Sequence, residues 1–530
     1  MQAIADRLQA ADWMAAAALA ETALEAGDRG ALLHKLRALR RQQAGRWAAA
    51  AEDIRAALAE WPEDFSAWNL LGFCEARAGR PEAAVAALDR AIALNPGYAP
   101  AFVNKAWALD AMGELKAARQ AYEAAAGLDP ADPRPGAGLA LLAARAADWT
   151  GARSLAEAAL ARDPAQGSAQ MALAMTELGE GQAAAALERL DALLARPDLD
   201  PHERAVALGF KGDALDKLDR IDDAFAAFTA ANAGLAQVYG GALRGREGGA
   251  DKARRLSRAF AALPPGGFPE PAPDPHRPRI TGHVFLLGFP RSGTTLLGQI
   301  LDVHPGVVTL DERETLADAA EAFLEPADGL KRLADASPAE IDRLRAAYWG
   351  RVGKAGLDLD GKVFVDKLPL NTLGLPLIAR LFPEAKIVFM RRDPRDVVLS
   401  SFRQRFAVSP ATAEFLTLEG AARYYDAVMA LAETYRMGLE LDIRDQDYKA
   451  LTTDFEGQVR ALCAFIGVDW DPAMEGFAGR SGAVATPSAA QIARGLYRDG
   501  AGQWRRYAGP LEPIMPILTP WTVQFGYEPS

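Results

Sequence analysis

The sequence predicts two parts of different fold class: an all-α array of helical hairpins over residues 1–235, and an α/β domain with a mostly parallel sheet over residues 280–530. Three observations support this division. The first half is rich in alanine and leucine at helical spacing, with breaks that recur at a fixed interval. A proline-rich stretch follows, and after it short apolar runs alternate with helical patterns, which is typical of a parallel sheet.

Length and composition set limits on both domains. A chain of 530 residues, 50% hydrophobic and 24% charged, is too long for one ordinary domain and can bury several cores. Its net charge of −11 argues against a general nucleic-acid binder. Two cysteines, Cys74 and Cys463, exclude a disulfide framework, and five dispersed histidines give no support for a metal site. The N-terminus is not that of a signal peptide, and no apolar stretch is long enough for a membrane span, so we expect a cytoplasmic protein.

The breaks in the first half recur every 34 residues. One turn is marked by Pro62, Pro96, Pro130 and Pro164, and a second by Gly45, Gly79 and Gly113. Trp13, Trp47 and Trp149 fall on the same register. A helix–turn–helix period of this length resembles tetratricopeptide repeats. Each hairpin would bury its apolar face only against its neighbours, so we expect about six hairpins stacked in a solenoid.

The role of this array is open on the sequence alone. Such arrays commonly hold peptides or partner proteins, which favours recruitment of a protein or peptide. The alternative is a scaffold that supports or dimerises the second domain. Residues 236–279 are expected to form a partly helical connection that ends in a linker, because Leu263–Arg279 carries seven prolines.

The α/β domain begins with a strand, a tight loop and a helix. Val284–Leu287 is a short apolar run, Gly288–Gly293 is a turn, and Thr294 opens a helix with an apolar stripe. This arrangement points free backbone N–H groups at an anion, to which Arg291 and Thr295 add donors. The spacing approximates a Walker A loop, but Thr294 stands where that motif requires lysine, which argues against a nucleoside triphosphatase. The alternative is a turn that binds nothing.

Two further strand ends carry polar residues. Lys362–Asn371 reads as a strand and polar turn, and Lys386–Asp396 as a strand that ends in Arg391-Arg392 before a helix start at Asp393-Pro394. Ser400 lies two turns into that helix, so Arg392 and Ser400 can converge on one phosphate. Two anion sites at two strand ends indicate a ligand with two separated phosphates. The alternative for the arginine pair is a solvated cap on the strand.

Together these segments resemble the sulfotransferase superfamily that uses 3′-phosphoadenosine 5′-phosphosulfate, in particular bacterial tetratricopeptide-repeat sulfotransferases and, more distantly, tyrosylprotein sulfotransferases. Residues 291–295 match the family loop for the 5′-phosphosulfate, and residues 392–400 match the segment for the 3′-phosphate. Residues 486–497 with 504–507 resemble a late segment that closes over the nucleotide. The resemblance implies a metal-free donor site made of Arg291, Ser292, Gly293, Thr294, Thr295, Arg392, Ser400 and Arg494.

The resemblance also implies three catalytic residues. Glu312 matches the family general base, with Glu314 as the second choice, although the charge pattern alone favours an exposed acidic turn here. Lys367 and Ser488 match residues that hold the transferring group. The expected reaction moves a sulfuryl group to a hydroxyl or phenolic acceptor, with a mild preference for a protein or peptide. The rival hypotheses are a non-enzymatic adaptor with a degenerate nucleotide-binding domain and a P-loop kinase.

Overall fold

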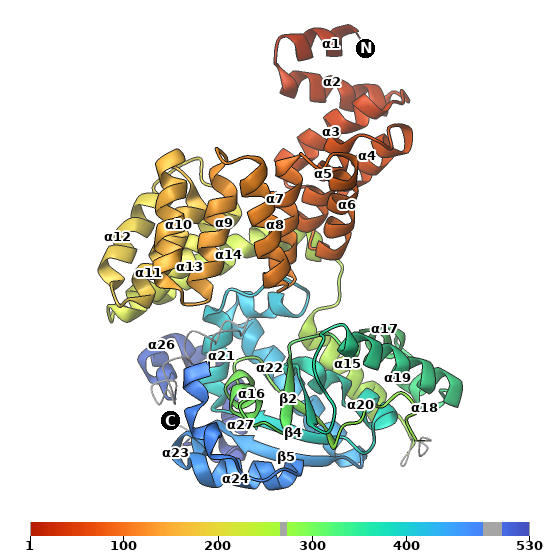
Figure 1. Cartoon of the computed structure of the whole chain (residues 1–530), viewed down its shortest axis with the longest axis vertical. Helices are drawn as coiled ribbons and strands as arrows, with labels where there is room; N and C mark the ends of the chain where they lie inside the picture. The colour runs from red at the N-terminus through yellow and green to blue at the C-terminus, as the bar shows by residue number, and fades with distance from the viewer. Residues whose placement is uncertain (1, 265–272, 481–500, 529–530) are drawn as a thin grey trace. The chain divides into compact units, whose positions relative to one another are not determined.

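The computed structural model describes residues 2–264, 273–480 and 501–528, with only the backbone described for residues 478–480. The chain divides into two compact units (Figure 1). The first contains Met1–Arg246 together with Arg405–Ser409, and the second contains Glu247–Gln404 together with Pro410–Ser530. Among the described residues, no helix is long and apolar enough to cross a membrane.

The first unit is a stack of antiparallel helical hairpins, as Figure 1 shows from α3 to α14. Its helices are α1 (Gln2–Gln9), α2 (Trp13–Glu25), α3 (Ala31–Gln43), α4 (Trp47–Glu60), α5 (Phe65–Arg77), α6 (Pro81–Leu94), α7 (Ala99–Ala111), α8 (Leu115–Leu128), α9 (Pro133–Arg145), α10 (Trp149–Arg162), α11 (Gly167–Gly179), α12 (Ala183–Leu194), α13 (Pro201–Lys217) and α14 (Ile221–Leu243). Each hairpin packs on the next through buried alanine and leucine. The predicted repeat solenoid is confirmed.

The 34-residue period is visible in the backbone at the turn inside each hairpin. Six positions on one register have positive φ: Ala11, Gly45, Gly79, Gly113, Ala147 and Gly181, with values from 55° to 82°. Four are glycine, which adopts this conformation without steric cost, and two are alanine, which does not. The period therefore continues through Ala11 and Ala147, where the sequence has no glycine to mark it.

The other turn of each repeat ends a helix just before a proline. Helices α4, α6, α8 and α10 stop two residues before Pro62, Pro96, Pro130 and Pro164. The residue between adopts a C-cap with φ between −120° and −142°, as expected because proline disfavours helical geometry in the residue before it.

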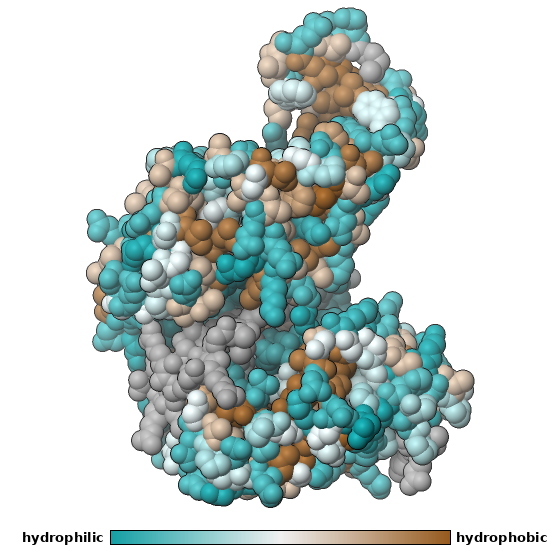
Figure 2. Space-filling model, viewed as in Figure 1, coloured by the Kyte–Doolittle hydropathy of each residue, from teal (hydrophilic) through white to brown (hydrophobic). Residues whose placement is uncertain are grey.

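Apolar side chains reach the surface near the first helices of the array (Figure 2). In α2, Trp13 is 56% exposed and Met14 is 51% exposed. In the equivalent place of the next hairpin, Trp47 packs edge-on against Phe73 with ring centroids 5.7 Å apart.

The second unit is built on a five-stranded sheet in the order β2-β3-β1-β4-β5. The strands are β1 (Gly282–Gly288), β2 (Val307–Asp311), β3 (Val363–Lys367), β4 (Lys386–Arg391) and β5 (Asp442–Asp447), and all four pairings are parallel. Val284 of the central strand lies opposite Val365 in β3 and Lys386 in β4. Parallel pairing places the carboxyl ends of all strands along one edge, where ligands bind in such sheets.

Helices cover both faces of this sheet. They are α15 (Gly249–Ala261), α16 (Thr294–Asp302), α17 (Ala317–Phe323), α18 (Gly329–Ala334), α19 (Pro338–Gly353), α20 (Leu375–Leu381), α21 (Pro394–Arg403), α22 (Leu418–Gly438), α23 (Tyr448–Thr453), α24 (Phe455–Ile466), α26 (Ala508–Leu511) and α27 (Met515–Gln524), with 3₁₀ turns η1 (Pro369–Gly374), η2 (Thr412–Leu416), η3 (Pro472–Arg480), η5 (Gln503–Tyr507) and η6 (Glu512–Ile514). On one face, α16 and α24 pack against Val284, Val365 and Met390. On the other, Tyr348 of α19 lies against Phe285.

The predicted α/β class is confirmed, and three predicted strands and the helix from Thr294 are present as β1, β3, β4 and α16. Asp393 caps α21 through the Arg395 N–H at 3.0 Å, with Pro394 in the first turn, as the sequence indicated. The stretch expected as a connection, residues 236–279, holds the end of α14 and also α15, which belongs to the second unit.

Candidate active site

The loop after β1 is shaped by residues with positive φ. Arg291 has φ 68° and Gly293 has φ 108°. A Cβ on Gly293 would lie 2.6 Å from Cδ2 of Tyr448, so the chain passes too close to that ring for any side chain. The loop thus runs directly into the N-terminus of α16, the geometry that binds anions at helix N-termini.

The hydroxyls of this loop are buried. Ser292, Thr294 and Thr295 are 2%, 3% and 7% exposed. The Ser292 hydroxyl has no hydrogen-bond partner within the described parts of the chain. A buried hydroxyl without a partner costs stability, and such groups occur where a ligand or water supplies the missing bond. Thr372 of η1 braces the loop from outside, since its hydroxyl donates to the Gly288 carbonyl at 2.9 Å.

The loop and the end of β4 meet through two arginines. Arg291 Nε donates to the Ser400 hydroxyl at 2.9 Å, and Arg392 Nη1 donates to the Arg291 carbonyl at 3.1 Å. Burial, together with the neighbouring charge of Arg392, lowers the pKa of Arg291 to about 10. Two half-buried guanidinium groups held near each other form a site that a multiply charged anion would stabilise.

Two residues at this place were missed by sequence reasoning. Tyr448, the first residue after β5, carries the Arg392 guanidinium over its ring at 4.8 Å from the centroid. Arg403, at the end of α21, acts electrostatically on Arg291. Neither had a clear signal, because β5 is a polar strand of sequence Asp-Ile-Arg-Asp-Gln-Asp and Arg403 lies beyond the matched segment.

The second half of the site is an acid–lysine cluster at the ends of β2 and β3. Lys367 is fully buried, and its Nζ donates to Glu312 Oε1 at 2.8 Å and also contacts Asp311. Burial raises the pKa of Asp311 even though Lys367 opposes the shift. Asp311 was not singled out from the sequence, although it directly precedes Glu312.

Of the two glutamates considered as the base, Glu312 is the one that contacts Lys367. Its side chain is 40% exposed, so an acceptor can reach it. Glu312 lies at φ 47°, a conformation that non-glycine residues rarely adopt. Glu314 is exposed and acts electrostatically on Arg351 of α19 instead.

The two halves lie side by side at the carboxyl edge of the sheet. Lys367 is opposite Leu286 of β1, two residues before the loop begins. The carboxylate of Glu312 acts electrostatically on Arg291 and partly opposes the lowering of the Arg291 pKa by burial. The structure thus brings together the predicted residues Arg291, Ser292, Gly293, Thr294, Thr295, Glu312, Lys367, Arg392 and Ser400.

Ser488 and Arg494 lie outside the described residues. The chain re-enters the described part next to α21, where the Gly502 and Trp504 N–H groups donate to the Asp396 carboxylate at 2.7 Å and 2.9 Å. Trp504 is 7% exposed, and Tyr507 is fully buried. These two aromatic side chains are therefore part of the core.

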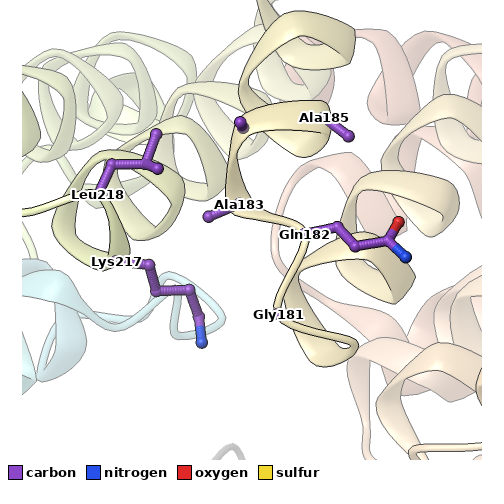
Figure 3. Close-up of a pocket in the computed structure, with 7 residues that line it drawn as sticks. Gly181, Gln182, Ala183, Ala185, Lys217 and Leu218 are labelled. Carbon is purple, nitrogen blue, oxygen red and sulfur yellow. The ribbon is translucent and has the colours of Figure 1, made fainter.

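A separate depression lies in the repeat array, at the turn between α11 and α12 and the end of α13. It is lined by Gly181, Gln182, three alanines, Lys217 and Leu218. Figure 3 shows the polar ends of Gln182 and Lys217 extending in different directions. Because these groups do not converge, the depression lacks the few placed polar groups of a ligand site. Among the described residues there is also no cluster of histidine, cysteine and acidic side chains that could hold a metal ion.

The fold and the site define a helical-repeat protein that carries an α/β group-transfer domain, and the family models agree. Residues 283–472 match the sulfotransferase family, and residues 35–99 and 75–142 match tetratricopeptide repeats. The chain therefore combines tetratricopeptide repeats with a domain that matches the sulfotransferase family.

Curated relatives extend this assignment. An uncharacterized protein of Aquifex aeolicus is 31% identical over 244 residues, which are 44% of this chain and 32% of the relative. Protein-tyrosine sulfotransferase 1 of Danio rerio is 24% identical over 275 residues, covering 46% of this chain and 72% of that protein. The nodulation protein NoeE of Sinorhizobium fredii is 33% identical over 130 residues, covering 22% and 30%. The chain thus spans only about a third of the Aquifex protein's length.

Solved structures resemble the repeat part. A tetratricopeptide repeat protein from Parabacteroides merdae is 12% identical, covers 46% of this chain and 97% of its own, and gives a TM-score of 0.37. A thermophilic repeat protein from Thermus thermophilus is 20% identical, covers 34% and 98%, and gives a TM-score of 0.31.

Proposed function

We propose that this protein transfers a sulfuryl group from 3′-phosphoadenosine 5′-phosphosulfate to a hydroxyl acceptor, with a tyrosine phenol in a peptide as the first candidate. The observation that carries the proposal is the position of the Glu312–Lys367 pair beside the Arg291–Arg392–Ser400 cluster at one edge of the sheet. Such an arrangement offers an anion site and a proton acceptor next to each other.

The donor fits the two parts of the cationic cluster. The loop from Arg291 to Thr295, with its buried hydroxyls and the start of α16, suits the phosphosulfate end. Arg392 and Ser400 suit the 3′-phosphate. Ser488 and Arg494 are proposed to add donors to the same nucleotide. The sulfotransferase family model and the relatives described as sulfotransferases support this donor.

The reaction follows from the roles of Glu312 and Lys367. The acceptor hydroxyl passes its proton to Glu312, and its oxygen forms a bond to the sulfur. The bond from sulfur to the 5′-phosphate oxygen breaks, and the electron pair remains on that oxygen. Lys367, freed from Glu312 as the glutamate is protonated, donates to the oxygen on which negative charge develops. In this scheme the guanidinium and ammonium groups supply the positive charge, and no metal is needed.

We further propose that the acceptor is phenolic and that the repeats recruit it. Relatives that are described as protein-tyrosine sulfotransferases support a phenolic acceptor. The tetratricopeptide repeats support recruitment of that acceptor as part of a protein or peptide. Dimerisation through the repeats and a cytoplasmic location stay predictions.

The donor site is tested by calorimetric titration with adenosine 3′,5′-bisphosphate in the absence of metal. We expect binding by the wild type and a roughly 10- to 100-fold loss in Arg392→Ala, because a hydrogen bond between two charged groups contributes about 1.5–3 kcal/mol. Arg460→Ala is the matched control, since Arg460 on α24 forms an exposed ion pair with Glu456 and lies over the Trp470 ring, and it contacts none of the proposed donor residues that the structure describes. Absence of binding in the wild type would refute the donor assignment and favour an adaptor.

Activity is tested with sulfur-labelled donor and a synthetic tyrosine peptide. Transfer that is lost in Glu312→Gln and retained in Glu314→Gln supports the assigned base. Magnesium-dependent turnover of ATP, with no sulfate transfer, would instead favour a kinase.

A further inference from the structure

The turn that carries Glu312 is held in a strained shape from one side of the sheet. Its φ of 47° lies in the left-handed region, which is strained for a residue with a side chain. The Glu312 N–H donates to the Lys367 carbonyl at 2.7 Å. The Glu312 carboxylate receives the Lys367 ammonium. Lys367 thus contacts both the backbone and the side chain of Glu312.

The same turn is also held from the opposite face. Asp366 precedes Lys367 in β3, and alternate side chains of a strand point to opposite faces. Asp366 is fully buried, and its Oδ2 accepts the hydroxyl of Thr315 at 2.6 Å. Thr315 follows Glu312 by three residues and is 2% exposed. The turn is therefore tied to β3 at both of its ends.

The Thr315 bond belongs to a buried chain of polar groups. Asp366 Oδ2 also accepts the Tyr348 hydroxyl at 2.9 Å, and Tyr348 Oη lies 2.8 Å from His283 Nε2. Asp366 Oδ1 has no partner among the described residues. A buried carboxylate with one unpaired oxygen destabilises a fold. A contribution to stability therefore does not explain Asp366, which directly precedes Lys367.

We propose that Asp366 is a positioning residue that, through Thr315, fixes the Glu312 turn so that its carboxylate faces Lys367. This inference rests on the proposed function, in which Glu312 is the base. Asp366 and Thr315 touch neither donor nor acceptor. Without their bond the turn can relax to an ordinary negative φ, and the Glu312 carboxylate then moves away from the acceptor oxygen. Donor binding is unaffected, because the Arg291 loop is held by Thr372 and Ser400 instead.

Two substitutions separate positioning from a general loss of packing. Thr315→Val removes one hydroxyl that donates to Asp366 Oδ2 and keeps the side-chain shape. Tyr348→Phe removes the other hydroxyl on the same oxygen and leaves the Glu312 turn untouched. Thr315→Ser restores the hydroxyl and serves as the rescue.

The first measurement is independent of activity. Amide hydrogen exchange, followed by mass spectrometry with fragmentation at single-residue resolution, reports on the Glu312 N–H. We expect at least tenfold faster exchange in Thr315→Val than in wild type, little change in Tyr348→Phe, and recovery in Thr315→Ser. Equal exchange in Thr315→Val and wild type would overturn the proposal, whatever the activity of the enzyme.

The second measurement uses sulfate transfer to a synthetic tyrosine peptide. We expect kcat of Thr315→Val to fall roughly 10- to 100-fold, as for small misplacements of a catalytic group, with an unchanged Kd for adenosine 3′,5′-bisphosphate. An unchanged kcat in Thr315→Val would overturn the positioning role and leave the proposed function standing. No transfer and no nucleotide binding by the wild type would overturn the proposed function, and the exchange experiment alone would then decide the geometry.

Discussion

Protonation of His283 links the pH of the solution to the stability of the sheet that carries the site. His283 lies in β1 and is 2% exposed. It is stacked among Phe285, Trp349 and Phe364 with ring centroids 4.6–5.6 Å apart. Burial, together with the charge of Arg277, lowers its pKa from 6.5 to about 3. The folded protein therefore keeps His283 neutral at pH values where the unfolded chain binds a proton.

The magnitude follows from this shift. Below pH 6.5 the unfolded state gains a proton at His283 that the folded state does not, so stability falls with falling pH until the folded pKa is reached. Between about pH 7.5 and about pH 5 the loss is roughly 2 kcal/mol, since one pKa unit corresponds to about 1.4 kcal/mol. His283→Gln removes this loss, and the Gln amide can still donate to Tyr348.

Asp366 changes the stability with pH in the opposite direction to His283, so wild type must be compared with the His283→Gln variant. Burial raises its pKa from 3.8 to about 6, so the folded state takes up a proton at Asp366 before the unfolded state does. Stability from this group therefore increases as the pH falls through 6 towards 3.8. In the wild type the two effects partly cancel. The difference between wild type and His283→Gln isolates the histidine.

The assay is hydrogen exchange of the β1 and β3 amides, from which opening free energies are obtained at both pH values. We expect the difference between His283→Gln and wild type to shift by about 2 kcal/mol in favour of the variant at the lower pH. The same difference at both pH values, or a histidine resonance that titrates near its ordinary pKa, would refute the reasoning.

Two further predictions concern backbone positions with positive φ. Gly293→Ala should weaken binding of adenosine 3′,5′-bisphosphate roughly tenfold or more, because the new Cβ would lie 2.6 Å from Tyr448 at φ 108°; an unchanged Kd in calorimetry would contradict the close packing of this loop. In the repeat array, Ala147→Gly should stabilise and Gly113→Ala should destabilise by about 1 kcal/mol each, because both positions have positive φ. Urea unfolding followed by circular dichroism measures both changes, and shifts of the same sign would count against this explanation.

The strands that could be predicted are the three in the middle of the sheet. β1, β3 and β4 have neighbours on both sides and buried side chains on both faces, so each reads as a continuous apolar run. The two edge strands, β2 and β5, did not stand out. β2 is only partly buried, and β5 is mostly polar. Apolar patterning detects burial, and an edge strand has less of it.

The same limit applies to the site. The proximity of Arg291, Lys367 and Arg392 could be predicted, because the carboxyl ends of parallel strands share one edge. Their individual partners could not. Ser400 was expected to join Arg392, and in the structure it accepts from Arg291. Tyr448 was missed together with the strand that positions it. The glycines at 45, 79 and 113 marked the repeat turns, whereas Ala11 and Ala147 adopt the same conformation unmarked.

The pairing order of the sheet has a consequence for synthesis of the chain. Val284 in the central strand β1 pairs with Val365 of β3 and Lys386 of β4, so both neighbouring strands are synthesised after β1. The loop that follows β1 therefore lacks the two flanking strands of the sheet until most of the second unit has left the ribosome. The repeat hairpins pair with their sequence neighbours and can form as they emerge. During translation, a folded array is thus expected to precede an incomplete, aggregation-prone sheet, and chain release soon after β4 would yield the repeats without a complete α/β unit.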